Sequence, residues 1–293
     1  MIAAAGAMTR EGLSTPILSS VAALAGESDA WICDVWGVLH NSVNAFGAAV
    51  DACRRFRDRG GVVALLSNAP RPGHVVQQQL DSLRVPRDAY DAIVTSGDLT
   101  RALVRERPRE ALFHLGPARD AALFDGLSVR FTDASHARLL VCSGLFDDER
   151  ETPEDYASML GVLAGRKVPM ICANPDLTVE RGKRIVYCAG ALAEFYERLG
   201  GSVTYAGKPH LPVYKLVIEQ ITRLKGHAVP KTRMLAIGDG IQTDIRGAAN
   251  AGVRSLFIAS AIHVDGPLTT ATLSRLFEGS DVRPIAAMPA LAW

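Results

Sequence analysis

Three short apolar runs, each followed within two residues by a polar residue, constrain the fold of this chain most strongly. The runs are continuously apolar rather than alternating, which is typical of strands buried on both faces of a parallel sheet. Open α/β sheets bind their ligands at the carboxyl ends of such strands, so we expect the polar residues to share one sheet edge. The runs and their polar residues are 31–33 with Asp34, 62–66 with Ser67 and Asn68, and 234–237 with Asp239.

Helical patterns alternate with these runs. Apolar residues recur at helical spacing between 46 and 60, where two glycines end the pattern, and another helix is predicted from 72 to 83. Strand, helix and strand in succession predict a parallel sheet with right-handed crossovers. A second α/β pattern of roughly a hundred residues follows, which is a normal domain size. The other predicted strands are 92–95, 111–115, 139–142, 168–172 and 254–259. The other predicted helices are 13–25, one around Asp120, 156–163, 189–199 and one that follows Gly240 and ends at Gly252.

The composition favours a globular protein with two domains. At 293 residues and 48% hydrophobic content, the chain can build a large core. The formal charge of +1 gives no overall field that would attract nucleic acid, and no apolar run approaches the ~20 residues that span a membrane. Five cysteines without CxxC spacing favour buried, reduced thiols in a cytoplasmic protein. Residues 1–15 lack the basic region of a signal peptide, and we expect a disordered leader there.

Four motifs carry a resemblance to a known family. They are Asp-Val-Trp-Gly-Val-Leu-His at 34–40, Ser67-Asn68, Gly-Lys-Pro around Lys208, and Gly-Asp-Gly-Ile-Gln-Thr-Asp at 238–244. In this order they resemble the signatures of the haloacid dehalogenase superfamily, and more narrowly its class IIA branch of sugar-phosphate, nitrophenyl-phosphate and pyridoxal-phosphate phosphatases. The resemblance implies a Rossmann-like α/β core with a parallel sheet, residues 16–98 and 204–293, and an inserted α/β cap domain of the C2 type, residues 99–203.

The resemblance also implies roles for the carboxylates. Asp34 is similar to the nucleophile of the superfamily, which attacks phosphorus to give an aspartyl-phosphate. A Mg²⁺ ion, which prefers oxygen ligands, would be held by Asp34, Asp239 and the backbone carbonyl of Trp36. Asp244 would lie in the outer shell of this metal site. An equally weighted alternative stays open, in which Asp244 only complements the positive end of the helix after Gly240.

Three further residues suit a phosphate group. Ser67 and Asn68 offer a hydroxyl and an amide ahead of a predicted helix, whose N-terminus favours anions. Serine before asparagine is also ordinary capping chemistry, so this signal is weak by itself. Lys208, in a rigid Gly-Lys-Pro turn, would pair as a compact cation with Asp34 and with the phosphate.

The first motif departs from the superfamily at Trp36. Phosphatases of the superfamily usually have an aspartate there, which protonates the leaving oxygen and then activates water. An indole has one N–H donor and no basic atom, so Trp36 can perform neither step, and such a loss typically costs ~10²- to 10⁴-fold in rate. A less characterised class IIA set shares the Asp-Val-Trp-Gly-Val-Leu-His motif. His40 and His210 are candidates for the missing proton shuttle, although a structural role is favoured for each.

Asn174 and Asp176 follow a predicted strand of the second pattern and resemble a class IIA element that faces the substrate. A proline-centred turn is the equally weighted alternative. Together these features predict a Mg²⁺-dependent hydrolase of a small phosphorylated metabolite, such as a sugar phosphate. Two alternatives stay open: a catalytically weak protein that binds a phosphorylated metabolite, and a phospho-accepting regulatory domain, which the inserted cap disfavours. The sequence names no substrate, and it leaves a homodimer open.

Overall fold

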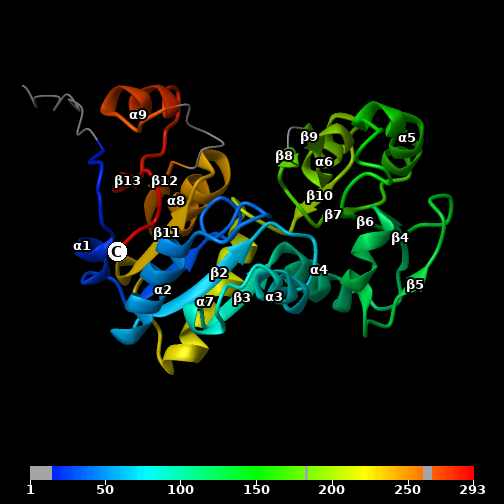
Figure 1. Ribbon diagram of the computed structural model, residues 1–293. Coiled ribbons are helices and arrows are strands. Elements are labelled where there is room, and N and C mark those ends of the chain that lie inside the picture. Colours follow the sequence, from blue (N-terminus) through cyan, green and yellow to red (C-terminus); the bar gives the residue numbers. More distant parts are fainter. Residues whose placement is uncertain (1–14, 182–183, 260–265) are drawn as a thin grey trace, which may run out of the picture.

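The computed structural model describes residues 15–181, 184–259 and 266–293, and in them the chain forms two α/β units side by side (Figure 1). The predicted leader, residues 1–15, lies almost wholly outside these ranges. The larger unit has six parallel strands, which confirms the predicted Rossmann-like core. In sheet order these strands are β13 (Ala286–Met288), β12 (Arg254–Ile258), β11 (Met234–Gly238), β1 (Ala30–Cys33), β2 (Val62–Ser67) and β3 (Ala92–Thr95).

The register of the central strands brings the predicted polar residues to one edge of this sheet. Cys33, the last residue of β1, lies opposite Leu65 of β2 and opposite Ile237 of β11. A hydrogen bond of 2.8 Å from the Asp34 N–H to the Ile237 carbonyl continues this ladder. Because the three strands run in the same direction, the residues that follow them emerge together. These residues are Asp34, Ser67, Asn68 and Asp239.

Alternate residues of the central strands pack into two buried layers, one on each face of the sheet. On one face, Trp31 stacks on Phe56 with ring centroids 4.0 Å apart, whereas Ile32 packs into the layer on the other face. Burial on both faces explains why the strand sequences are continuously apolar. The covering helices are α2 (Gly47–Asp58) and α3 (Gly73–Ser82) on the first face, and α4 (Ser96–Arg105), α7 (Leu211–Lys225) and α8 (Arg246–Ala251) on the second.

The smaller unit lies in the chain between β3 and α7, as predicted for an inserted α/β domain. One face of its five-stranded sheet is covered by α5 (Ala157–Gly165) and α6 (Ala189–Arg198). On the other face, Leu112 and Ile171 share a buried cluster with Leu99 of α4, which joins the two units. The parallel strands, in sheet order, are β10 (Val203–Tyr205), β7 (Met170–Cys172), β6 (Leu139–Cys142), β4 (Ala111–Leu115) and β5 (Arg130–Phe131).

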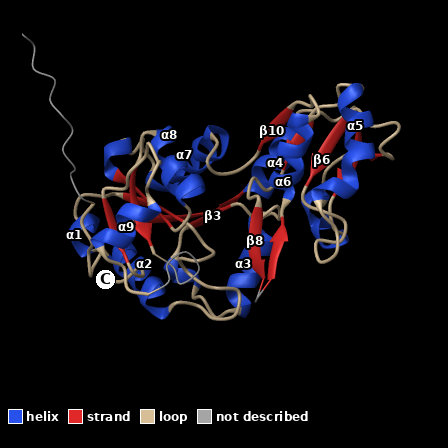
Figure 2. Ribbon diagram, turned by 90° about the horizontal axis from the view of Figure 1, so that it is seen from above, coloured by secondary structure: helices blue, strands red, loops and turns tan. Residues whose placement is uncertain are grey.

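Several shorter elements complete the described chain. An antiparallel hairpin of β8 (Thr178–Arg181) and β9 (Arg184–Tyr187) stands apart from the five-stranded sheet (Figure 2). No described helix is both long enough and apolar enough to cross a membrane. All five cysteines are buried and none of them forms a disulfide, as predicted. The remaining helices are α9 (Thr270–Leu276) and short 3₁₀ segments at Arg87–Ala89, Ala118–Phe124, Pro153–Tyr156 and Lys231–Arg233.

One local expectation was wrong, and two further features were not predicted. The helix predicted over 13–25 is reduced to α1 (Ala22–Ala25), because the residues before it bond to the last strand, where Ile17 pairs with Ala287. The C-terminal tail, for which no structure was predicted, supplies β13 and buries Leu291 in the core. The helix after Gly240 begins with a π-helical turn, Ile241–Ile245, before α8.

Candidate active site

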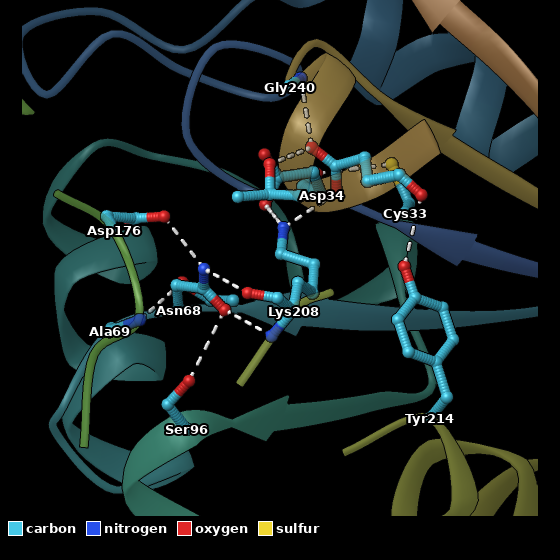
Figure 3. A network of polar contacts seen from close by, with 12 residues as sticks. Cys33, Asp34, Asn68, Ala69, Ser96, Asp176, Lys208, Tyr214 and Gly240 are labelled. Atoms are coloured by element: carbon cyan, nitrogen blue, oxygen red, sulfur yellow. Dashed lines mark hydrogen bonds and ion pairs between the residues drawn. The ribbon is translucent and has the colours of Figure 1, made fainter. Parts of the chain in front are cut away.

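Lys208 lies between two carboxylates at the carboxyl edge of the core sheet. Its Nζ donates to Asp34 Oδ1 at 2.6 Å and to Asp244 Oδ1 at 2.8 Å, and all three side chains are buried (Figure 3). Asp34 follows β1, Asp244 lies in the turn after β11, and Lys208 precedes α7. The fold thus brings together three segments that are far apart in the sequence. The pairing with Asp34 agrees with the sequence prediction, and the pairing with Asp244 adds to it.

Burial and the charges of neighbouring groups together shift the pKa values of Asp34 and Lys208. Burial raises the pKa of Asp34 well above its usual value, the negative charge of Asp244 adds to this shift, and Lys208 opposes it. Burial also disfavours the charge on Lys208, but Asp244 and Asp34 outweigh this effect and raise its pKa. Lys208 therefore stays protonated and acts as a fixed cation.

Asp34, Asp239 and Asp244 form a group that could hold a metal ion. Each is buried, and their carboxylate oxygens lie within 4.8 Å of one another. Three buried carboxylates beside one lysine leave negative charge for a further cation, and an all-oxygen donor set suits a hard divalent ion. Gly37, at φ +81°, makes room for this group, because a Cβ there would lie 2.0 Å from Asp239 Oδ2. Trp36, the predicted carbonyl ligand, precedes Gly37 and lines the same cleft.

Asn68 connects the core site to the smaller unit. Its Oδ1 accepts from the Lys208 backbone N–H at 2.8 Å, and its Nδ2 donates to the Lys208 carbonyl at 3.2 Å and to Asp176 Oδ1 at 2.8 Å. Because both ends of the amide are engaged, Asn68 holds the Lys208 backbone in this arrangement. Ser67 Oγ accepts from the Ala69 N–H at 3.2 Å, which is a local contact of the kind expected from the capping alternative. Ser67 also lines the cleft.

Asn174 and Asp176 form a turn directly after β7. Asn174 Oδ1 accepts from the Asp176 N–H at 3.0 Å, and both residues line the cleft. Gly190, at the start of α6, lets this turn pack closely, because a Cβ there would lie 2.2 Å from the Pro175 carbonyl oxygen. Burial raises the pKa of Asp176, although Asn68 and the charge of Lys208 oppose the shift. The proline-centred turn therefore places a carboxyl group at the cleft.

The Trp36 indole is held within its own loop. Its Nε1–H donates to Ser42 Oγ at 2.7 Å, and the Ser42 N–H donates to His40 Nδ1 at 3.0 Å. His40 is 2% exposed, and burial lowers its pKa to about 4. His210 stacks on Tyr205 with ring centroids 4.5 Å apart, and burial lowers its pKa as well. Both imidazoles line the cleft but are fixed by packing.

A cleft with a volume of about 1450 Å³ joins the two units at this edge. The core lines it with Asp34 and Lys208, and the smaller unit lines it with Ser143 and with Ile185 and Tyr187 of the hairpin. This volume exceeds that of most small-ligand pockets, which hold roughly 300–1,000 Å³. The cleft therefore has room for a small phosphorylated molecule together with solvent.

The sequence analysis missed two residues that support the site. Ser96 Oγ lies 3.4 Å from Asn68 Oδ1, and the Tyr214 hydroxyl donates to the Asp244 carbonyl at 3.2 Å. Ser96 directly follows β3, so applying the strand-end rule to residues 92–95 would have identified it. Tyr214 lies on the buried face of α7 and carries no signal that separates it from other core residues.

Comparisons with known sequences identify related proteins. Residues 31–130 match the family described as haloacid dehalogenase-like hydrolase, and residues 205–275 match one described as HAD-hydrolase-like. The 5'-nucleotidase YutF of Bacillus subtilis (strain 168) is 24% identical over 237 residues, which cover 79% of this chain and 87% of that protein. The ribonucleotide monophosphatase NagD of Escherichia coli (strain K12) is 24% identical over 238 residues, with the same coverage of 79% and 87%.

Solved structures give the same result. A hydrolase from Brucella suis 1330, described as haloacid dehalogenase-like, is 44% identical with a TM-score of 0.84, and the match covers 94% of this chain and 100% of that one. The 4-nitrophenylphosphatase of Thermotoga maritima shares the fold at 21% identity and a TM-score of 0.70, over 91% of this chain and 96% of that one. These relatives confirm the predicted class IIA resemblance. Because the 44% identity extends over nearly the whole chain, this protein belongs to the haloacid dehalogenase-like family of hydrolases.

Proposed function

We propose that this protein is a Mg²⁺-dependent phosphatase that removes phosphate from a small phosphomonoester through an aspartyl-phosphate on Asp34. The observation that carries this proposal is the buried Lys208 between Asp34 and Asp244, with Asp239 completing a carboxylate group within 4.8 Å. Phosphoryl transfer depends mainly on positioning and on neutralising charge. This arrangement offers a carboxylate nucleophile, a fixed cation and oxygen ligands in one buried place.

The first step forms a bond between Asp34 and phosphorus while the bond from phosphorus to the leaving oxygen breaks. Lys208 orients the Asp34 carboxylate and neutralises a phosphate oxygen, and Asn68 holds the Lys208 backbone in place. Ser67 offers its hydroxyl to the phosphate. The second step transfers phosphorus from Asp34 to water and regenerates the carboxylate.

The metal site is the second part of the proposal. Asp34, Asp239 and the Trp36 carbonyl would hold Mg²⁺, and Asp244 would lie just behind these ligands. When bound, Mg²⁺ supplies positive charge that stabilises the developing charge on the phosphoryl oxygens. Asp244 Oδ2 also accepts from the Gly240 N–H at 3.0 Å, which fixes the turn that presents Asp239.

We assign the unit with the six-stranded sheet to the core domain and the unit with the five-stranded sheet to a cap. Because β10 (Val203–Tyr205) belongs to the cap sheet, we place the end of the cap after residue 205 rather than at residue 203. The cap supplies Asn174 and Asp176 to the cleft, contacts the leaving group and excludes water when it closes. The relatives named as a 5'-nucleotidase, a ribonucleotide monophosphatase and a 4-nitrophenylphosphatase support a phosphomonoester as the substrate class.

Phosphate release by the purified protein tests this function. The assay uses 4-nitrophenyl phosphate with a panel of nucleotide and sugar phosphates, in excess Mg²⁺ and in chelator. We expect Mg²⁺-dependent release that Asp34→Asn abolishes and that Asp58→Asn, an exposed aspartate on α2, leaves intact. Absence of release on every compound, or release that survives in Asp34→Asn, would contradict the proposal.

A further inference from the structure

The proposed reaction needs a group that moves protons, and Trp36 cannot supply it. An alcohol leaves readily only when its oxygen is protonated, and water attacks phosphorus readily only when a base removes a proton. The Trp36 indole has no basic atom, and its N–H donates to Ser42 within its own loop. The acid must therefore come from another residue along the cleft.

The geometry of phosphoryl transfer indicates where that acid lies. The attacking oxygen and the leaving oxygen are roughly in line through phosphorus. Asp34 stands at the carboxyl end of β1 with the core sheet behind it, so the leaving oxygen points away from this sheet. Residues of the smaller unit line the cleft on that side. The acid is thus expected on the cap rather than on the core.

Asp176 is a cap carboxyl group that is bonded directly to the core site. Its Oδ1 accepts from Asn68 Nδ2 at 2.8 Å, and Asn68 Oδ1 accepts from the N–H of Lys208, whose Nζ contacts Asp34 at 2.6 Å. Figure 3 shows this connection across the site. The other oxygen of Asp176 makes no hydrogen bond among the described residues, so it is available to a substrate. Burial also favours the protonated form and raises the pKa of Asp176, as an acid requires.

Other cap carboxylates that line the cleft interact elsewhere. Asp148 forms an ion pair with Arg119, and Glu197 accepts from the Tyr205 hydroxyl at 2.8 Å. Asp120 is buried in the segment that follows β4, and β6 separates β4 from β7, the strand that leads to Asp176. Asp176 is therefore the candidate that the contacts support best.

We propose that Asp176 is the general acid and general base of this enzyme, a proposal that rests on the proposed phosphatase function. As the bond from Asp34 to phosphorus forms and the bond to the leaving group breaks, the Asp176 carboxyl proton passes to the leaving oxygen, which departs as an alcohol. The Asp176 carboxylate then takes a proton from water, whose oxygen bonds to phosphorus as the bond to Asp34 breaks. Inorganic phosphate leaves, and Asp176 is protonated again.

The acid comes from the cap, and the nucleophile comes from the core. Hydrolysis of a substrate with a poor leaving group then requires the two units to be closed on each other. Attack by Asp34 alone does not require this closure. The hydrogen bond from Asn68 to Asp176 joins the two units at the site in this structure.

A pair of substrates that differ in leaving group tests the assignment. Asp176→Asn keeps a carbonyl oxygen for the Asn68 bond but has no proton to give. We expect its kcat/KM to fall ~10²- to 10⁴-fold for phenyl phosphate, whose leaving group needs a proton. For 4-nitrophenyl phosphate, whose leaving group is stable as an anion, we expect a change of only a few-fold. Asp120→Asn, which changes a buried carboxylate of the cap, serves as the control and should affect the two substrates alike.

A second variant separates catalysis from structure. Trp36→Asp places a carboxyl group two residues after Asp34, so we expect it to restore phenyl phosphate hydrolysis in the Asp176→Asn background. Equal losses on both substrates without this rescue would make Asp176 a structural contact, and no loss on either would also overturn the assignment. A wild-type protein inactive on both substrates would instead contradict the phosphatase function itself.

Discussion

Replacing Lys208 with methionine would test the electrostatics at the centre of the site. Methionine keeps a long, unbranched side chain but removes the charge that contacts Asp34 at 2.6 Å and Asp244 at 2.8 Å. All three residues are buried, so water cannot replace the lost cation efficiently. We expect the variant to be inactive even with Mg²⁺, and its metal-free form to be clearly less stable than the metal-free wild type.

The expected loss of stability follows from these distances. At about 3 Å and an effective dielectric constant of about 20, each lysine–carboxylate pair attracts by about 6 kcal/mol. The desolvation of three charged groups offsets most of this attraction, and removing one partner of such a buried pair costs about 3–5 kcal/mol. In a domain of 150–250 residues, each kcal/mol corresponds to about 2–4 °C in Tm, so we expect a decrease of about 10 °C.

Thermal unfolding in chelator and in excess Mg²⁺ measures this effect. A divalent cation among the carboxylates replaces part of the missing charge, so Mg²⁺ should raise the Tm of Lys208→Met more than that of the wild type. Lys215→Met, at an exposed position on α7, is the matched control and should unfold like the wild type. Equal Tm values for Lys208→Met and wild type in chelator would refute this reasoning.

Two further predictions concern single positions. In Gly37→Ala, a Cβ placed 2.0 Å from Asp239 Oδ2 should displace that carboxylate and weaken Mg²⁺ binding about 10- to 100-fold in calorimetric titration. Gly47→Ala is the control, because a Cβ at that position meets no atom within 4 Å. Equal Mg²⁺ affinities of the two variants would contradict the proposed ligand set. Burial lowers the pKa of His114 in the cap from 6.5 to about 4. Between pH 6.5 and 4, the imidazole therefore binds a proton in the unfolded chain but not in the folded one. The free energy of unfolding consequently falls as the pH falls through this range. At 1.36 kcal/mol for each pKa unit, the loss in the free energy of unfolding across this range is about 3 kcal/mol. His114→Gln should therefore flatten the pH dependence of urea unfolding between pH 6.5 and 4, and a slope as steep as that of the exposed control His227→Gln would contradict the assignment.

Local sequence patterns were sufficient to predict the centre of the core sheet but not its edge. The strand β2 is buried at every residue, and its apolar run predicts this directly. The strand β13 has only three residues, two of them alanines, and exists because it pairs with β12. Pairing with β13 also draws Ile17 out of the helix predicted for 13–25. At this edge of the sheet, long-range pairing overrides local helical propensity.

Local sequence patterns were likewise sufficient to predict only part of the site. The strand-end rule located Asp34 and Asp239, because the register of parallel strands brings their ends to one level. It could not find the contact between Asn68 and Asp176, which lie 108 residues apart and meet only because the cap packs on the core. Asp244 makes two contacts that sequence patterns did not predict: Oδ1 accepts from Lys208 Nζ, and Oδ2 accepts from the Gly240 N–H after β11.

Detection of the covalent intermediate tests the central claim most directly. The protein is mixed with 4-nitrophenyl phosphate and Mg²⁺, quenched during turnover and treated with borohydride, which reduces an acyl phosphate to homoserine, and its peptides are analysed by mass spectrometry. The proposed mechanism predicts homoserine at position 34, dependent on Mg²⁺ and absent in Asp34→Asn. Phosphate release without any modification of Asp34, or modification of another residue, would contradict it.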